Sequence, residues 1–254
     1  MSARKLLTNL GLALCLAACA TGAPRGEPPL SDDARRLIAL LTLRRDQFSD
    51  LRALVELTVR RGERTQRYTG VVLAKPPASL RFEALSPFNQ PVFLAAMSAG
   101  SLTTYDVYGN RAMKAPVSAR AAGWWLGIPL EAEDVVALLI GRVLPPREVR
   151  EAEILPADAT GPSLRLVGRE RTERIWMDFE TGDVVRAEIQ GGRTTLVVEY
   201  AWAASDSLPT GIRATAGPDF EAIVRYRQPA LATGVEEERF RLVLPEGANL
   251  QPLP

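Results

Sequence analysis

The sequence contains no histidine, and its two cysteines, Cys15 and Cys19, both lie near the N-terminus. Without histidine the chain lacks the usual general base, the commonest zinc ligand and the usual partner of a catalytic serine or cysteine. Two cysteines so placed supply neither a disulfide framework nor a cysteine-based metal site in the body of the chain. We therefore expect a protein that is not an enzyme and that uses no cofactor and no metal ion.

The chain also lacks an excess of charge of either sign. Lysine and arginine total 31, aspartate and glutamate total 30, and the formal net charge is +1. A nucleic-acid-binding protein needs a basic excess to displace counterions, so we expect no nucleic-acid partner. In contrast, 46% of the 254 residues are hydrophobic, which is enough for a sizeable core in one large domain or two small ones.

The N-terminus has the pattern of an export signal. Arg4 and Lys5 precede an uncharged, mostly apolar run over residues 6–18. This run is shorter than the roughly 20 residues of a membrane-spanning helix and fits a cleaved signal peptide. Its end, Leu16-Ala17-Ala18-Cys19, resembles a bacterial lipobox, which implies diacylglycerol transfer to the Cys19 thiol and cleavage before Cys19. The alternative is an ordinary signal peptide with an incidental cysteine.

These features divide the chain into three parts. Residues 1–18 form the lipoprotein signal peptide, residues 19–30 form the lipidated cysteine with a tether rich in Pro, Gly and Ala, and residues 31–254 form one domain. Several acyl chains on one cysteine would anchor the protein firmly in a membrane. Ala20 follows the cysteine where inner-membrane lipoproteins of the enterobacterial type carry aspartate. We therefore expect a lipid-anchored protein of the outer membrane that faces the periplasm.

Helical spacing occurs in two segments of the domain. Ser31 can cap a helix over 32–48 whose first turn holds Asp32 and Asp33, which are favourable near the helix N-terminus. A second helix is predicted over 131–143, where valine, leucine and isoleucine form a broad apolar face.

Elsewhere a period of two dominates, with turn signals between the apolar runs. Strands are predicted at 54–60, 67–74, 80–85, 91–97, 101–107, 111–114, 151–155, 163–168, 173–179, 184–190, 194–201, 210–216, 219–227 and 237–243. So large an antiparallel sheet must curl to bury its apolar face. The fold class is therefore mainly β with helices (α+β): a curled antiparallel sheet that forms an open half-barrel covered by α-helices.

Four local segments, together with the lipobox, resemble the LolB family of outer-membrane lipoprotein receptors and its relatives. Residues 81–88 (RFEALSPF) look like a strand that runs into the family's protruding loop, and residues 126–130 (LGIPL) precede the apolar helix as in the family. The hairpins around residues 178–182 and 191–192, and the closing strand 240–245, also fit. The resemblance covers nearly the whole chain and implies a fold of the LolA/LolB type.

The resemblance implies an apolar cavity that holds the acyl chains of other lipoproteins, or lipids. The implied partners are acylated lipoproteins, a LolA-like periplasmic carrier and the inner leaflet of the outer membrane. Phe88 occupies the position of the family's exposed, membrane-inserting leucine, which it replaces with a larger ring. The longer chain and a second proline in this loop leave room for a paralogue of the receptor.

Apolar side chains on the predicted strands and on the second helix are candidates for lining this cavity. They are Phe82, Leu85, Phe93, Trp124, Trp125, Val135, Leu138, Leu139, Trp176 and Phe179. Strand alternation selects ordinary core residues in the same way, and one of the two adjacent tryptophans can equally be core.

Two other functions remain open at this point. A structural envelope lipoprotein could use the same fold as a scaffold, with the cavity filled by its own side chains. An envelope hydrolase could act on sugars through paired carboxylates, although the missing histidine weighs against an enzyme.

Overall fold

The structure, a computed structural model, describes residues 30–116, 130–203 and 208–251. Its elements in chain order are α1 (Asp32–Asp46), β1 (Leu51–Arg61), β2 (Arg64–Lys75), β3 (Ser79–Leu85), β4 (Pro91–Ser98), β5 (Ser101–Asp106), β6 (Arg111–Pro116), α3 (Ala132–Leu139), β7 (Glu151–Asp158), β8 (Gly161–Val167), β9 (Thr172–Met177), β10 (Val184–Gln190), β11 (Thr195–Ala201), β12 (Gly211–Ala216), β13 (Phe220–Leu231), η1 (Glu237–Phe240) and β14 (Asn249–Gln251). The predicted mainly β class with helices is confirmed. The signal peptide and Cys19 lie outside the described residues.

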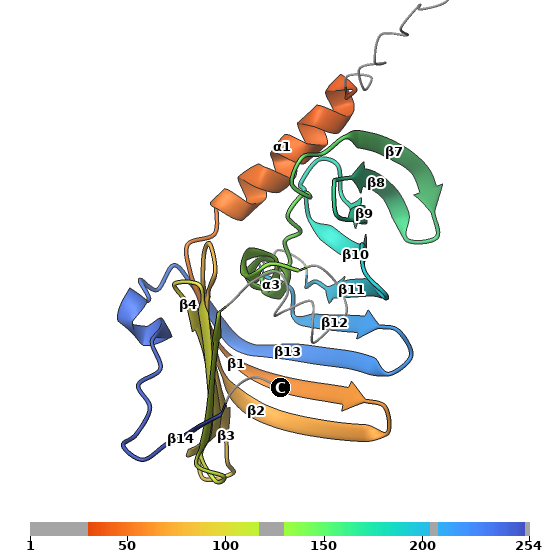
Figure 1. The fold of residues 1–254 in the computed structure, drawn as a ribbon. Coiled ribbons are helices and arrows are strands. Elements are labelled where there is room, and N and C mark those ends of the chain that lie inside the picture. Colours follow the sequence, from red (N-terminus) through yellow and green to blue (C-terminus); the bar gives the residue numbers. More distant parts are fainter. Residues whose placement is uncertain (1–29, 117–129, 204–207, 252–254) are drawn as a thin grey trace, which may run out of the picture.

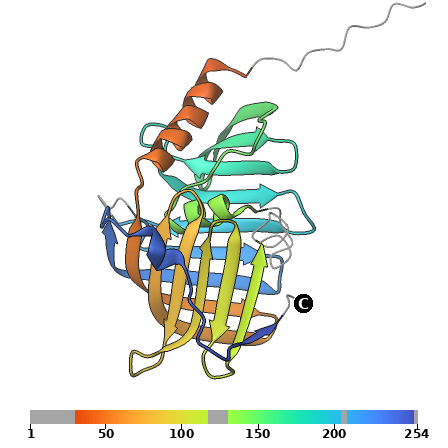
Figure 2. The same cartoon turned by 60° about the vertical axis from the view of Figure 1, so that its left-hand side comes forward.

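All 14 strands belong to one sheet, in the order β14-β6-β5-β4-β3-β2-β1-β13-β12-β11-β10-β9-β8-β7. Neighbouring strands are antiparallel, apart from the parallel pair β14 and β6. The pair β1 and β13 joins the two halves of the sheet. The sheet curls strongly, and its end strands, β14 and β7, do not pair with each other (Figure 1, Figure 2). The prediction of an open, curled antiparallel sheet is confirmed.

Alternating side chains give the sheet a buried concave face. Along β1, Leu51, Ala53 and Val55 are buried, whereas Arg52 and Leu54 are exposed. This period of two is what the sequence shows, because successive side chains of a strand point to opposite faces. Glycine also matters at Gly70 in β2, where a Cβ atom would lie 2.4 Å from the backbone oxygen of Glu83 in β3. The close approach of the two strands there requires glycine.

Helix α1 begins as the sequence predicts and ends two residues before the predicted limit of 48. The side-chain oxygen of Ser31 accepts a hydrogen bond from Ala34 N at 3.2 Å, which caps the first turn. Leu37 and Leu41 are buried in the core, and Arg44 forms an ion pair with Asp183 at the turn before β10. These contacts attach α1 to the end of the sheet that holds β7 to β10 (Figure 1).

Helix α3 is shorter than the predicted helix over 131–143. It ends at Leu139 because Gly141 has a φ of +73°, a left-handed conformation that favours glycine at a helix C-terminus. The ring of Trp202 packs against this glycine, so that a Cβ atom there would lie 2.9 Å from the ring. The indole N–H of Trp202 donates to the backbone oxygen of Val184 at 2.8 Å. Tertiary packing thus fixes where α3 stops.

The predicted strand over 237–243 is wrong. This segment forms the short helix η1 and an irregular chain that packs on the outer face of β3 and β4, with Phe240 fully buried. The Arg81 guanidinium donates to the backbone oxygens of Arg239 and Arg241, at 3.0 and 3.2 Å, in place of a strand neighbour. The apolar pattern of the segment reflects the burial of one face against the sheet, which a helical turn satisfies as well as a strand.

Among the described residues, no helix has the length and apolar character needed to span a membrane.

Candidate functional site

An apolar cavity of about 320 Å³ lies between α3 and the concave face of the sheet. Strands β1, β2, β3, β11, β12 and β13 form its floor, and α3 with the preceding Leu130 forms its roof. Val55 and Val198 come from opposite halves of the sheet and are both buried. The cavity therefore exists because the sheet curls around α3, and no single hairpin could form it.

The wall of this cavity offers a ligand almost no hydrogen-bonding group. Tyr226 is the one lining residue with a polar side chain, and its hydroxyl donates to the backbone oxygen of Leu139 at the end of α3. Burial raises the pKa of this tyrosine above its usual range, so the hydroxyl stays neutral. Because a buried polar group without a partner is costly, such a wall favours a purely apolar ligand.

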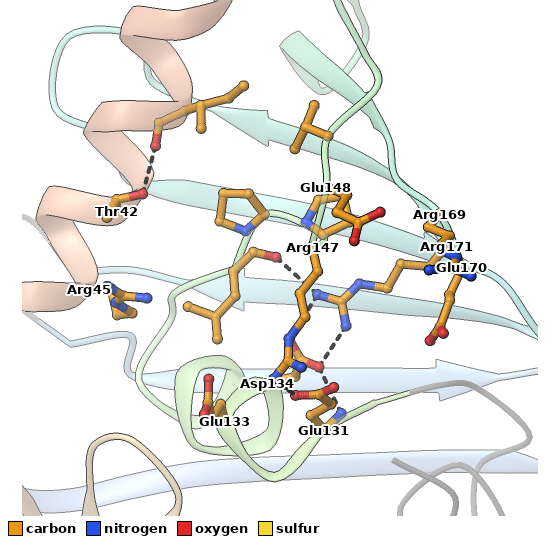
Figure 3. A pocket seen from close by; sticks show the side chains of 15 residues that line it. Thr42, Arg45, Glu131, Glu133, Asp134, Arg147, Glu148, Arg169, Glu170 and Arg171 are labelled. Atoms are coloured by element: carbon orange, nitrogen blue, oxygen red, sulfur yellow. Dashed lines mark hydrogen bonds and ion pairs between the residues drawn. The ribbon is translucent and has the colours of Figure 1, made fainter.

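A second, charged cleft of about 650 Å³ lies between α1, the start of α3, the segment 144–149 and the turn 169–171 (Figure 3). Both acidic and basic side chains line it, together with prolines and a few aliphatic residues. Arg147 forms an ion pair with Glu131 across the cleft. The cleft therefore differs in chemistry from the apolar cavity, and α3 contributes to the walls of both.

Beside this cleft a buried charge cluster attaches α3 to the sheet. The guanidinium of Arg171 donates to both carboxylate oxygens of Asp134, at 2.6 and 2.8 Å, and to the backbone oxygen of Leu144 at 3.1 Å. Its Nε lies 2.6 Å from the carboxylate of Glu173, which is fully buried. Asp134 also accepts from the backbone N–H of Glu131, as the N-terminal cap of α3 requires.

Burial raises the pKa of Glu173 to about 8. The nearby charge of Arg171 opposes this rise, whereas the negative charge of Asp134 adds to it. One guanidinium is thus shared by two carboxylates, and burial together with the charge of Asp134 favours the protonated form of Glu173.

Four of the ten predicted cavity residues line the apolar cavity: Phe82 on β3 and Val135, Leu138 and Leu139 on α3. These residues face one another from the sheet and from the helix, as the resemblance implies. Trp124 and Trp125 lie outside the described residues, so their predicted place at the cavity mouth stays a prediction.

The other predicted residues lie elsewhere. Leu85 ends β3 just after a register shift, and Phe93 of β4 pairs with Ala84 of β3; neither Leu85 nor Phe93 lines the cavity. Phe179 is partly buried against the core in the turn before β10. Phe88 is 85% exposed at the turn between β3 and β4.

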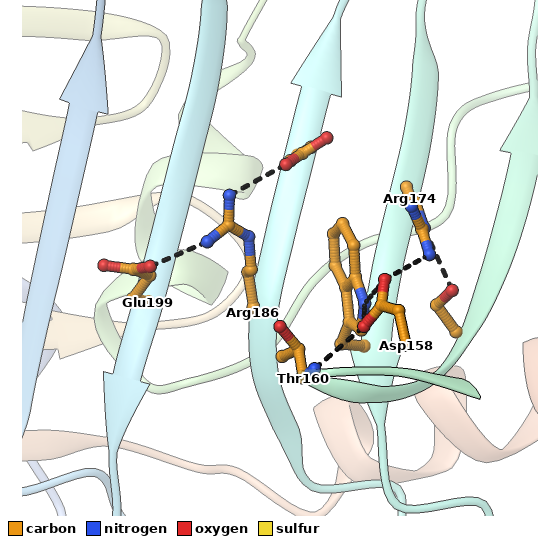
Figure 4. Close-up of polar contacts among 8 residues, drawn as sticks. Asp158, Thr160, Arg174, Arg186 and Glu199 are labelled. Atoms are coloured by element: carbon orange, nitrogen blue, oxygen red, sulfur yellow. Dashed lines mark hydrogen bonds and ion pairs between the residues drawn. The ribbon is translucent and has the colours of Figure 1, made fainter.

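Trp176 lies on the face of β9 opposite to the core residues Ile175 and Met177, beside the polar contacts of Asp158 and Arg174 that Figure 4 shows. Its indole N–H donates to the carboxylate of Asp158 at 3.0 Å, and its ring lies between the guanidinium groups of Arg174 and Arg186, at 4.1 and 5.3 Å. Its strand neighbours Ile175 and Met177 face the core instead. The polar and cationic groups around this ring give it a structural role at the sheet surface.

Sequence reasoning missed the part of the cavity floor that β13 provides. Phe220, Ala222, Val224 and Tyr226 all line the cavity, and they are alternate residues of one strand. Their spacing was the available signal, since alternate residues of a strand share a face. The sequence does not reveal that β13 pairs with β1, and this pairing brings the face of β13 that carries these residues beneath α3.

Comparison with known proteins identifies the fold. No family model matches the sequence, and no curated protein matches it. Solved structures do match, among them these three. An outer membrane lipoprotein-sorting protein domain from Vibrio parahaemolyticus has a TM-score of 0.56 at 13% identity, over 82% of this chain and 97% of that one. A DUF1329 family protein from Desulfovibrio piger has a TM-score of 0.56 at 12% identity, over 83% and 98%.

A LolA superfamily protein from Nitrosomonas europaea has a TM-score of 0.52 at 14% identity, over 82% of this chain and 97% of that one. At such low identities the similarity establishes the fold alone, because one fold can serve several functions. The chain therefore has a LolA-like fold.

Proposed function

We propose that this protein is an outer-membrane lipoprotein of the LolB type, which binds the acyl chains of other lipoproteins or lipids in its apolar cavity and helps to insert them into the outer membrane. The observation that carries the proposal is the cavity itself, whose lining is apolar apart from one tyrosine with a satisfied hydroxyl. The LolA-like fold supports the same conclusion.

The energetics suit a carrier. Each methylene group transferred from water contributes roughly 0.8 kcal/mol, so a long acyl chain gains several kcal/mol even after the entropic cost of binding. No hydrogen bond from the wall has to break when the chain leaves. A ligand held by apolar contact alone can therefore be both bound and released without a chemical step.

The remaining parts of the proposal concern delivery. Cys19 is the proposed lipidation site, which would hold the protein at the inner leaflet of the outer membrane. A LolA-like periplasmic carrier is the proposed donor of the acylated cargo. Phe88, exposed on its turn, is the proposed contact with the membrane. Helices α1 and α3 are proposed to form the cover of the half-barrel.

The test is the uptake of a fluorescent fatty acid by a form that begins at Ala20, which keeps every described residue. Ala222 lines the cavity on β13, and Ala222→Phe would fill part of it. Ala230, on the same strand, is exposed, so Ala230→Phe is the matched control. We expect saturable uptake by the wild type and the control, and at least tenfold weaker uptake by Ala222→Phe, since blocked burial of two methylenes corresponds to about that factor.

Absence of uptake by the wild type would contradict the proposal and favour a scaffold lipoprotein. Equal uptake by all three proteins would place the bound fatty acid outside this cavity. Native mass spectrometry of the protein from the periplasm of a didermic bacterium would then identify any natural cargo by its mass.

A further inference from the structure

Two neighbouring turns of the sheet expose large aromatic side chains. Phe88, between β3 and β4, is 85% exposed, and Tyr108, between β5 and β6, is 81% exposed. Apolar groups that are exposed close together can mark a surface that contacts a partner or a membrane. Tyr108 belongs to no site that the sequence predicts.

Both turns are closed by internal polar contacts. In the first, the backbone N–H of Ser86 donates to the oxygen of Gln90 at 2.8 Å. In the second, Asp106 accepts from the backbone N–H of Gly109 at 3.0 Å and pairs with Arg111 at 2.8 Å. The two rings are therefore presented by ordered turns, and little conformational entropy would be lost when they contact a partner.

The strand register places the two turns side by side. Phe93 of β4 pairs with Asp106 of β5, and the backbone N–H of Val107 donates to the oxygen of Val92 at 3.1 Å. The turns consequently project from the same edge of the sheet, below the body of the molecule in Figure 2. This edge is remote from α1, which lies at the opposite end in both views.

A basic side chain flanks this edge. Thr69 of β2 pairs with Leu85 at the end of β3, so Arg67, two residues earlier on β2, lies beside the start of the first turn. Arg67 is exposed and has no ion pair within the described residues.

An acidic residue lies near the second turn. Glu246 precedes Gly247, whose backbone oxygen accepts a hydrogen bond from Asn110 in that turn. Asp106 is neutralised by its ion pair with Arg111. The charge beside Phe88 is therefore basic, whereas both signs of charge occur beside Tyr108.

We propose that this edge is a composite membrane-docking surface in which Tyr108 inserts together with Phe88 while Arg67 contacts anionic phospholipid headgroups. Tyrosine is enriched at membrane interfaces because its ring is apolar and its hydroxyl stays at the headgroup level. Basic residues near an anionic bilayer surface are attracted to it. The proposal rests on the proposed function and adds a second insertion residue and a preference for anionic lipid.

The experiment is co-sedimentation of the form that begins at Ala20 with vesicles of phosphatidylcholine alone or of phosphatidylcholine with phosphatidylglycerol. Wild type should bind the anionic vesicles more tightly. Tyr108→Ser should weaken binding about tenfold to both vesicles, because one large apolar contact is lost. Arg67→Glu should weaken binding at least fivefold to the anionic vesicles alone.

Two variants serve as matched controls. Leu43 on α1 is 54% exposed and lies away from the edge, so Leu43→Ser should leave vesicle binding unchanged. Arg150, exposed before β7, has no ion pair in the described part of the chain, so Arg150→Glu controls for net charge.

Either of two results would overturn the proposal: equal binding of wild type and Tyr108→Ser, or equal binding of wild type to the two vesicles. No vesicle binding at all would also overturn it and would point to a protein partner for the edge. Fatty-acid uptake is measured on the same variants. Uptake should be unchanged by Tyr108→Ser and at least tenfold weaker in Ala222→Phe, which separates a failure of the docking surface from a failure of the cavity.

Discussion

Glu173 shows how one buried side chain couples this fold to pH. It is fully buried beside Arg171 and Asp134, and its pKa is raised to about 8 from the ordinary 4.5. A carboxyl with a raised pKa favours the folded state when it is protonated. Its contribution is therefore fully present below pH 4.5 and is lost as the pH rises towards 8.

Glu173→Gln should remove this pH dependence. The glutamine amide has nearly the same shape as the carboxyl group, and its oxygen can accept a hydrogen bond from Arg171, but it cannot ionise. We expect the free energy of unfolding of the variant to exceed that of the wild type increasingly from pH 5 to pH 8, by up to a few kcal/mol, since one pKa unit corresponds to about 1.4 kcal/mol. Urea unfolding at pH 4, 6 and 8.5 measures it.

The control for this prediction is Glu170→Gln, which alters an exposed glutamate in the turn before β9. Its stability should follow that of the wild type at each pH. Parallel curves for Glu173→Gln and wild type between pH 4 and 8.5 would contradict a raised pKa of Glu173.

At the scale of elements, α3 is held at both ends by contacts that its own sequence does not reveal. At its start, Asp134 pairs with Arg171, which lies on the far side of the intervening β7 and β8 in sequence. At its end, Leu139 accepts the hydroxyl hydrogen bond of Tyr226, and Gly141 packs against Trp202. A helix of eight residues has little intrinsic stability, so these contacts determine its length and position.

Gly141→Ala tests this attachment. The residue has a φ of +73°, and a Cβ atom there would lie 2.9 Å from the Trp202 ring. We expect the variant to lower the free energy of unfolding by about 2 kcal/mol or more, through backbone strain and the clash together. Chemical denaturation measures the loss, and fatty-acid uptake shows whether the roof of the cavity has moved.

Gly100 provides an unusually close control, because its φ of +71° is similar but no atom lies within 4 Å of the Cβ position. Gly100→Ala should therefore show the backbone strain without the clash, about 1 kcal/mol. If both variants lose the same stability, the contact with Trp202 does not fix the end of α3.

The sequence predicts elements better than it predicts which face they bury. The helix starting after Ser31 and nearly all the strands follow from capping and alternation. Phe82 and Leu138 line the apolar cavity, whereas Trp176, which the sequence grouped with them, faces outward between two arginines. Alternation fixes two faces of a strand, and the partner strands decide which of them is inside.

At the scale of the whole molecule, the curl of the sheet decides what the protein can bind. Strands β1 and β13, which are far apart in the chain, pair along nearly their whole lengths and form the middle of the cavity floor. No local pattern encodes this pairing, so the sequence predicted a curled sheet without its strand order. The cavity also leaves the core less completely filled, since its walls lack partner atoms on one side.

A bound acyl chain should therefore stabilise the entire fold. A ligand at a free concentration of 100 times its Kd raises the free energy of unfolding by about 2.7 kcal/mol when it binds the folded state alone. For a domain of this size that corresponds to an increase in Tm of roughly 5–11 °C. Thermal unfolding of wild type with and without saturating fatty acid measures the shift.

Ala222→Phe should show a much smaller increase in Tm, because the added ring occupies the ligand's place. Ala230→Phe should show the same increase as the wild type. A similar increase in the Tm of Ala222→Phe would mean that the fatty acid stabilises the protein from another site. The acyl chain would then not occupy the concave face of the sheet.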